Sequence, residues 1–289
     1  MTKIIGCFHV PCHFCIKYYK TMRVIYCPTD FSDLANHALD WAISLGQKLN
    51  APVHVLHTYQ VPYSADMMSS SLNEALKKSS EKEMEALLKP YTEKGLHLTP
   101  ELEWNSVTGA LRHRTRANPE AIVVMGSHGS SGWNATLMGS NAVAVMHAIQ
   151  NPLIIIPAKA AFYPDCMRWM YATDLQDESN PQTIAWLKQF MADSTSTMDL
   201  MHVESGDIDK SEAEQFLEYA DDHFEGYATY LVVNKSVEQG IYECASDQTA
   251  DGIVMIGRRH HWLKEAFHQS VSKAVAQHQA FPVLILKEL

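Results

Sequence analysis

The chain has 289 residues, of which 46% are hydrophobic and 19% charged, a composition typical of a globular protein with substantial cores. Its 33 acidic residues outnumber its 23 lysines and arginines, and the formal charge of −10 argues against nucleic acid as a partner. No run of 18 apolar residues predicts a membrane-spanning helix, so we expect no membrane partner and a cytoplasmic location. The length favours two domains, because domains commonly run to about 100–200 residues.

Residues 1–21 are expected to form a loosely ordered leader. The apolar stretch there is short, is interrupted by Pro11 and lacks a small-residue cleavage site, so it does not resemble a signal peptide. Cys12 and Cys15 form a Cys-x-x-Cys pair beside two histidines, which leaves zinc binding as an alternative. No second ligand pair has the standard spacing, so the sequence predicts no metal site.

The first half alternates buried strands with helices. A continuous apolar run at 23–29 predicts a strand that is covered on both faces, and apolar residues at helical spacing after Ser32 predict a helix. We expect Pro90 to end the second helix, because proline cannot donate a helical hydrogen bond. The predicted strands are 23–29, 53–59, 96–104, 121–125 and 153–156, and the predicted helices are 33–49, about 71–90, 108–117 and 140–149.

Residues 157–167 resemble a linker, after which the pattern starts again. The sequence at 169–174 parallels that at 24–30, and the sequence at 252–257 parallels that at 121–126. The predicted strands are 169–174, 198–204, 228–234, 252–257 and 281–286, and the predicted helices follow Pro181 and occupy 209–223, 237–249 and 270–277. The repeat predicts two tandem, doubly wound α/β units of Rossmann-like form, each a five-stranded parallel sheet with helices on both faces. Domain 1 would span 22–160 and domain 2 would span 161–289.

A glycine motif follows the fourth strand of the first unit. It consists of Gly126-x-x-Gly129, nine residues, and then Gly139-Ser140 at the start of a helix. Ligands of open α/β sheets bind at the carboxyl ends of strands, and helix amino ends offer free N–H groups to phosphate. Glycines let the backbone approach a ligand closely, although each of them could instead serve only a turn. The motif is neither a Walker loop nor the Rossmann glycine fingerprint.

Together with Pro28-Thr29-Asp30-Phe31-Ser32 after the first strand, this motif resembles that of the universal stress protein family. The resemblance covers residues 22–157 well and residues 168–289 more loosely. It implies an adenine nucleotide alpha hydrolase-like fold, often found as tandem or dimeric units. It also implies a stress-response regulatory protein that binds ATP, with or without Mg²⁺, or a related adenine nucleotide.

The resemblance further implies which residues would contact the nucleotide. They are Asp30, Thr58, Met125, Gly126, Gly129, Gly139, Ser140 and Asn141. Asp30 would contact the ribose or the adenine, and Thr58 would lie near the adenine. The residue type at Asp30 supports this independently, because a carboxylate at a strand end can accept hydrogen bonds from sugar hydroxyls; its alternative role is to cap a helix or turn. No catalytic residue is predicted, and at most slow ATP hydrolysis is expected.

The second unit lacks the intact motif. When Gly257 is aligned with the first glycine, His260 replaces the second and Gln269 the third, and the loop is one residue shorter. Asp174 is retained at the position of the first-unit aspartate. Side chains at the glycine positions would keep the backbone away from a phosphate, so we expect a degenerate site. The basic residues at 258–261 could attract an anion or form a solvated loop.

The last strand of each unit, 153–156 and 283–286, is apolar enough to need cover. The family resemblance implies that these strands pair, which predicts an intramolecular pseudo-dimer and leaves a further homodimer open. Two other functions also stay open: a scaffold that binds no nucleotide, and an enzyme such as an ATPase or phosphotransferase. His57 and His202 occupy matching strand positions and are expected to be core histidines that bond to the backbone.

Overall fold

A computed structural model gives the structure of the chain. It describes residues 23–59, 70–128, 138–161, 166–175, 181–206, 210–257 and 281–287. The proposed leader with its zinc alternative, the site residue Gly129 and the predicted helix at 270–277 lie outside these residues. No helix within the described ranges is long and apolar enough to cross a membrane.

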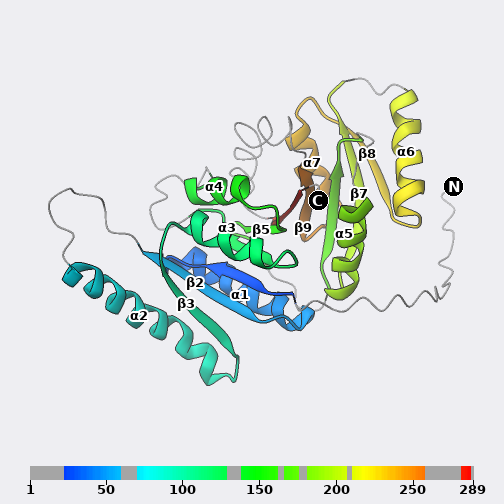
Figure 1. The fold of residues 1–289 in the computed structure, drawn as a ribbon. Helices are drawn as coiled ribbons and strands as arrows, with labels where there is room; N and C mark the ends of the chain where they lie inside the picture. Colours follow the sequence, from blue (N-terminus) through cyan, green and yellow to red (C-terminus); the bar gives the residue numbers. More distant parts are fainter. Residues whose placement is uncertain are drawn as a thin grey trace.

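The described strands form one continuous ten-stranded sheet in the order β3-β2-β1-β4-β5-β10-β9-β6-β7-β8 (Figure 1). The first half contributes β1 (Ile25–Pro28), β2 (Val53–Tyr59), β3 (Leu98–Trp104), β4 (Ile122–Gly126) and β5 (Leu153–Ile156). The second half contributes β6 (Arg168–Thr173), β7 (Thr197–Glu204), β8 (Thr229–Val233), β9 (Gly252–Gly257) and β10 (Val283–Lys287). Each half is a parallel five-stranded sheet, as the alternation of strands and helices predicts.

The two halves join through β5 and β10, which pair in an antiparallel direction, whereas all other neighbouring strands are parallel. Ile154 of β5 lies opposite Leu284 of β10. β5 and β10 are the last strands of their respective halves. Because they are equivalent and antiparallel, an approximate twofold axis at the junction relates the two halves. The carboxyl ends of the two sets of parallel strands therefore lie at opposite edges of the continuous sheet.

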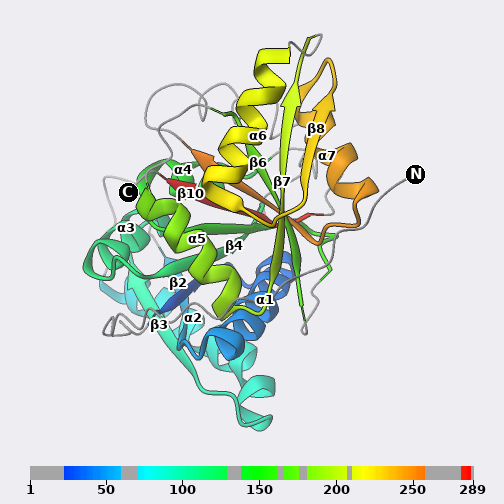
Figure 2. The ribbon, with the colours of Figure 1, turned by 90° about the vertical axis from the view of Figure 1, so that its right-hand side faces the viewer.

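Helices cover both faces of the sheet (Figures 1 and 2). One face packs against α1 (Asp33–Leu49), α2 (Ser70–Glu93), α5 (Pro181–Asp193) and α6 (Lys210–Phe224). The other face packs against α3 (Val107–Ala117), α4 (Ser140–Ala148) and α7 (Val237–Asp247). Each of the two apolar layers contains residues from both halves. Apolar side chains on both faces of the central strands explain why those strands have continuous apolar sequences.

The prediction that Pro90 ends the second helix is wrong, since α2 continues to Glu93. The last turn is held by contacts from outside the helix. The Tyr91 hydroxyl donates to Asp40 on α1 at 2.7 Å, and the Leu96 N–H donates to the Tyr91 carbonyl oxygen at 3.0 Å. Pro90 cannot donate to the carbonyl oxygen four residues before it, so the helix lacks one hydrogen bond there, yet it continues for three more residues.

Two contacts hold the first half against the second half and the linker. Arg23, which precedes β1, pairs with Asp193 at the end of α5 at 2.7 Å, and its guanidinium lies 5.6 Å from the ring centre of Trp186 on α5. His37 of α1 lies with Nε2 at 2.8 Å from the carbonyl oxygen of Ala160 in the linker. The first contact binds the start of the first sheet to the second half, and the second binds α1 to the linker.

The strand register shows which residues of the two halves are equivalent. Val123 pairs with Leu153 between β4 and β5, and Ile253 pairs with Val283 between β9 and β10. The spacing is thus the same in both halves. The matching turns after β1 and β6 make Thr29 equivalent to Thr173, and therefore Tyr26 equivalent to Met170. Tyr26 pairs with Val123 and Met170 pairs with Ile253, so equivalent residues of β4 and β9, and of β5 and β10, differ by 130 in number. Gly126 corresponds to Ile256, which is buried, and not to Gly257.

The alignment of Gly257 with the first motif glycine is therefore wrong by one residue. The same offset of 130 applies to the strands before and after the loop, so the two loops are equally long and the second is not shorter. Counted along the sequence, Arg259 and Gln269 then replace the second and third glycines, and His260 replaces neither. The second half retains none of the three motif glycines, because side chain-bearing residues replace all of them.

Candidate functional site

The carboxyl ends of β1, β2 and β4 meet at one edge of the first half. Pro28 pairs with Leu56, and the Thr29 N–H donates to the Leu56 carbonyl oxygen at 2.8 Å, so Asp30 and Thr58 follow directly beyond this point. Met125 lies near the end of β4, which is the other neighbour of β1. The structure therefore places these three predicted site residues at one edge.

A tight turn presents Asp30 at this edge. Phe31 has a φ of 63°, and its N–H donates to the Thr29 hydroxyl oxygen at 3.0 Å. The Asp30 carboxylate is exposed and accepts hydrogen bonds from the Ser32 hydroxyl at 2.6 Å and from the Ser32 N–H at 3.2 Å. Ser32 in turn accepts from the Ala35 N–H and caps α1. Asp30 thus supports a helix cap as well as facing solvent.

The turn is fixed from beneath by His57. Its Nδ1 donates to the Thr29 carbonyl oxygen at 2.9 Å, and its ring lies 4.3 Å from that of Phe31. His202 makes the same bond to the Thr173 carbonyl oxygen at 2.9 Å in the second half. The expectation that both histidines bond to the backbone is confirmed.

The two described motif glycines allow close contacts within the protein. A Cβ at Gly139 would lie 2.9 Å from the His128 Cα, and the Gly139 N–H donates to the Ser127 carbonyl oxygen at 2.8 Å. A Cβ at Gly126 would lie 3.0 Å from Cγ of Leu34. These glycines therefore bring the end of β4, α1 and the start of α4 together, which is a structural reason for them that requires no ligand.

The amino end of α4 differs from those of three other helices. Serine side chains cap α1, α3 and α7, but the residue that precedes α4 is Gly139, which has no side chain to cap it. Within the described residues, no acceptor bonds to the N–H groups of Ser140, Asn141 or Ala142. Both Ser140 and Asn141 are exposed. Free N–H groups and the helix dipole together make such an end attractive to anions.

Comparison with known sequences identifies the group to which the chain belongs. The profile of the Universal stress protein family matches residues 21–157 and again residues 167–287. The chain belongs to the universal stress protein family. No curated protein sequence matches this universal stress protein significantly.

Solved structures support the tandem arrangement. A universal stress protein from Archaeoglobus fulgidus DSM 4304 has 16% sequence identity and a TM-score of 0.64, and the alignment covers 92% of this chain and 96% of that one. A functionally unknown protein from Pseudomonas aeruginosa PAO1 has 13% identity, a TM-score of 0.63 and 93% coverage of both chains. At these identities the similarity establishes the fold alone. A universal stress protein solved in complex with cAMP has 20% identity and a TM-score of 0.36, and the alignment covers 46% of this chain and 96% of that one.

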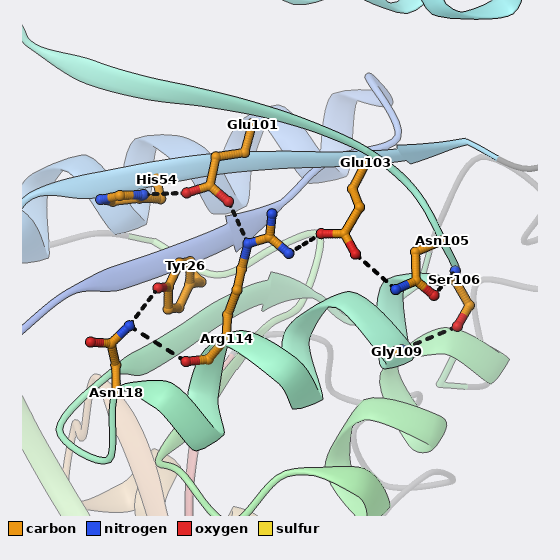
Figure 3. Close-up of polar contacts among 9 residues, drawn as sticks. All are labelled: Tyr26, His54, Glu101, Glu103, Asn105, Ser106, Gly109, Arg114 and Asn118. Carbon is orange, nitrogen blue, oxygen red and sulfur yellow. Dashed lines mark hydrogen bonds and ion pairs between the residues drawn. The ribbon is translucent and has the colours of Figure 1, made fainter.

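Beside the site, this universal stress protein contains a charged cluster between β3 and α3 (Figure 3). Arg114 of α3 pairs with both Glu101 and Glu103 of β3, and Glu101 also contacts Nδ1 of His54. The Asn105 amide donates to Glu103 at 2.8 Å. Every charged group in the cluster has an opposite or polar partner, so the cluster fastens α3 to the sheet.

The cluster shifts the pKa values of its members. Burial by itself raises the pKa of Glu103, but hydrogen bonds from Asn105 and Arg114 outweigh it and lower that pKa below its ordinary value. Burial likewise acts to lower the pKa of Arg114, and the two glutamates reverse this and raise it. Glu103 lies opposite Thr58 in the register, so the cluster ends next to the site. The cluster is not among the sequence predictions, although two glutamates at strand spacing on a half-buried strand indicate it.

Neither metal binding at the described residues nor thiol chemistry at Cys27 finds support. No group of three or more histidines, cysteines, aspartates or glutamates there is arranged to hold a metal ion. Cys27 of β1 is fully buried, and burial raises the pKa of its thiol to about 12. Its thiol is therefore protonated at neutral pH and unreactive.

Proposed function

We propose that the first half binds ATP or a related adenine nucleotide and that the chain acts as a stress-response regulator in the cytoplasm. One observation carries the proposal: the uncapped amino end of α4 and the Asp30 carboxylate belong to the same edge of the sheet. The first suits a phosphate, and the second suits the hydroxyls of a ribose. Together these groups would give a nucleotide two separate points of attachment.

Each site residue has a distinct part in this proposal. The N–H groups of Ser140 and Asn141, with the Ser140 hydroxyl, would donate to the phosphates, and the loop containing Gly129 would complete the phosphate contacts. Thr58 and Met125 would lie against the base. Mg²⁺ would arrive with the nucleotide, because this ion is commonly bound through substrate phosphates. The role is binding, with at most slow hydrolysis.

The second half would not bind a nucleotide in this way. It retains Asp174 and the turn that follows β6, where Leu175 has a φ of 57° and donates its N–H to the Thr173 hydroxyl oxygen at 3.2 Å. Ile256 replaces the first motif glycine, as the strand register shows. We therefore propose one nucleotide per chain, bound by one half of an intramolecular pseudo-dimer.

Isothermal titration of the full chain with ATP tests the proposal. Saturable binding with a stoichiometry near one is expected. Asp30→Asn should weaken binding at least tenfold, because it removes the charge that accepts from the ribose hydroxyls, whereas the matched control Asp174→Asn should leave the affinity unchanged. Absence of saturable binding at millimolar ATP would overturn the proposal, and equal effects of the two variants would overturn the assignment to the first half.

A second candidate function is a scaffold that binds no nucleotide. It is favoured by the contacts of Gly126 and Gly139, which are explained by packing against Leu34 and His128 alone. It is also consistent with the use of Asp30 in the helix cap of α1. The same titration distinguishes the two candidates, since a scaffold of this kind would show no saturable binding of ATP.

A further inference from the structure

A lysine from the second half holds the helix that begins at the proposed phosphate site. Lys287, the last residue of β10, donates from Nζ to the carbonyl oxygen of Ile149 at 2.5 Å and to that of His147 at 3.3 Å. These two oxygens lie at the carboxyl end of α4. The contact therefore joins two elements that are 138 residues apart in the chain.

The contact is directed to the half that contains the glycine motif. By the offset of 130, the first-half equivalent of Lys287 is Pro157, which follows β5 and has neither an amine nor an N–H to donate. The first half thus cannot make the reciprocal contact with the second. The backbone pairing of β5 with β10 is therefore symmetric, whereas the contact made by the Lys287 side chain exists on one side of the junction alone.

The chemistry of Lys287 suits a helix carboxyl end. A cation there interacts favourably with the helix dipole and satisfies carbonyl oxygens that have no partner within the helix. Lys287 is partly buried, which lowers the pKa of its amine, and none of the ion pairs among the described residues includes it. Its hydrogen bonds are therefore directed to α4 rather than to a carboxylate.

The length of α4 makes this anchor consequential. The helix has nine residues and lacks a capping side chain at its amino end, where the Gly139 N–H bonds to Ser127. Its carboxyl end and its buried face therefore make a large contribution to its position. Ala142, Val145 and Met146 supply that buried face. We propose that Lys287 is a positioning residue, through which the second half sets the affinity of the first half for the phosphates of its nucleotide. This inference rests on the proposed nucleotide-binding function.

The test compares ATP with adenosine, because only the phosphates would contact α4. In titrations of the full chain, Lys287→Met should weaken ATP binding about three- to tenfold, the range expected for loss of a charge at a helix end. Binding of adenosine should stay unchanged. Lys287→Arg, which keeps the cation, should retain most of the ATP affinity. Lys159→Met, which removes an exposed lysine from the linker, serves as the matched control and should behave as the wild type.

Each outcome supports or overturns the inference. If Lys287→Met weakens ATP and adenosine equally, the lysine acts only on general stability and the inference fails. If ATP affinity is unchanged in Lys287→Met while the wild type binds, the inference fails and the proposed function stands. If the wild type binds neither ligand, both fail. Hydrogen exchange without ligand supplies a second measurement: faster exchange of the α4 amides in Lys287→Met is expected, and unchanged exchange would contradict an anchoring role.

Discussion

The two halves share one turn at the end of their first strand but differ in what surrounds it. Thr29 and His57 in the first half make the same backbone contacts as Thr173 and His202 in the second. The half without motif glycines thus retains this turn unchanged. Features present in both halves are therefore required by the fold, and features present in one half alone are the better indicators of function.

This comparison changes the weight of individual site residues. Asp30 has a counterpart in Asp174, so an aspartate at this position does not by itself distinguish a binding half from a degenerate one. Gly126 and Gly139 have no glycine counterpart. The phosphate end of the proposed site therefore separates the halves more clearly than the ribose end does.

The halves also use different side chains for their arginine–carboxylate contacts. In the first half, Arg114 extends from α3 to two glutamates on β3. In the second half, Arg168 extends from β6 to Asp199 on β7, with 2.7 Å between Nε and the carboxylate, and donates to the Gln248 carbonyl oxygen at 2.6 Å. In both halves an arginine links strands to a helix. This arginine lies on a helix in the first half and on a strand in the second.

The largest effect is expected when Gly139, the third motif glycine, is replaced by glutamine, the residue that its counterpart Gln269 supplies in the second half. Gly139→Gln places a side chain where a Cβ alone would lie 2.9 Å from the His128 backbone. We expect ATP affinity to fall at least a hundredfold, or about 2.7 kcal/mol. Titration with ATP measures this. Gly206→Gln is the control, because Gly206 is exposed and a Cβ there would meet nothing nearer than a Glu204 carboxylate oxygen at 4.0 Å. A Gly139→Gln variant that still binds ATP normally would remove the distinction between the halves.

A smaller effect is expected from a strand pair that is packed differently in the two halves. Trp169 pairs with Gly252 in the second half, where the first half pairs Ile25 with Ile122. A Cβ at Gly252 would lie 2.5 Å from the Trp169 ring, so Gly252→Ala should lower the free energy of unfolding by about 2–3 kcal/mol. Urea denaturation measures the change. Combining it with Trp169→Ile should restore part of the loss, and no rescue would contradict the steric explanation.

The smallest effect is expected from the charged cluster of the first half. Arg114→Met leaves Glu101 and Glu103 partly buried without their cation, which should cost about 2 kcal/mol at pH 7, less than for a fully buried pair because the glutamates are partly exposed. The folded state lowers the pKa of Glu103, so its contribution is complete above the unfolded value of about 4.3 and is lost as the pH falls through the folded value. Urea denaturation between pH 7 and pH 3 should therefore show the variant approaching the wild type in acid. A difference independent of pH would exclude the charge as its cause.

The sequence predicts the elements of this fold well because each is determined locally. The predicted helix at 33–49 and the strand at 53–59 agree with α1 and β2 in full, since apolar spacing and the Ser32 cap are contained in the segment itself. The end of α2 was not predictable in this way. The contact between Tyr91 and Asp40 joins residues that are 51 apart and that only the fold brings together.

The equivalence of the two glycine loops failed for a related reason. Aligning Gly257 with Gly126 follows residue identity, whereas the sheet fixes equivalence by hydrogen bonding to neighbouring strands. The sequence did contain the correct spacing, because Pro152 and Pro282 follow Ser140 and Ser270 at the same distance. Contacts between the halves, such as that of Lys287, could not be predicted because local patterns carry no information about them.

The antiparallel contact of β5 and β10 also bears on how such a chain can change over generations. In a symmetric dimer of single units, any substitution appears at both ligand edges at once. Here the edges belong to different segments of one polypeptide and point away from each other. A mutation that destroys the ligand site at one edge therefore leaves the site at the other edge intact. Natural selection can then retain the intact site while the other diverges freely.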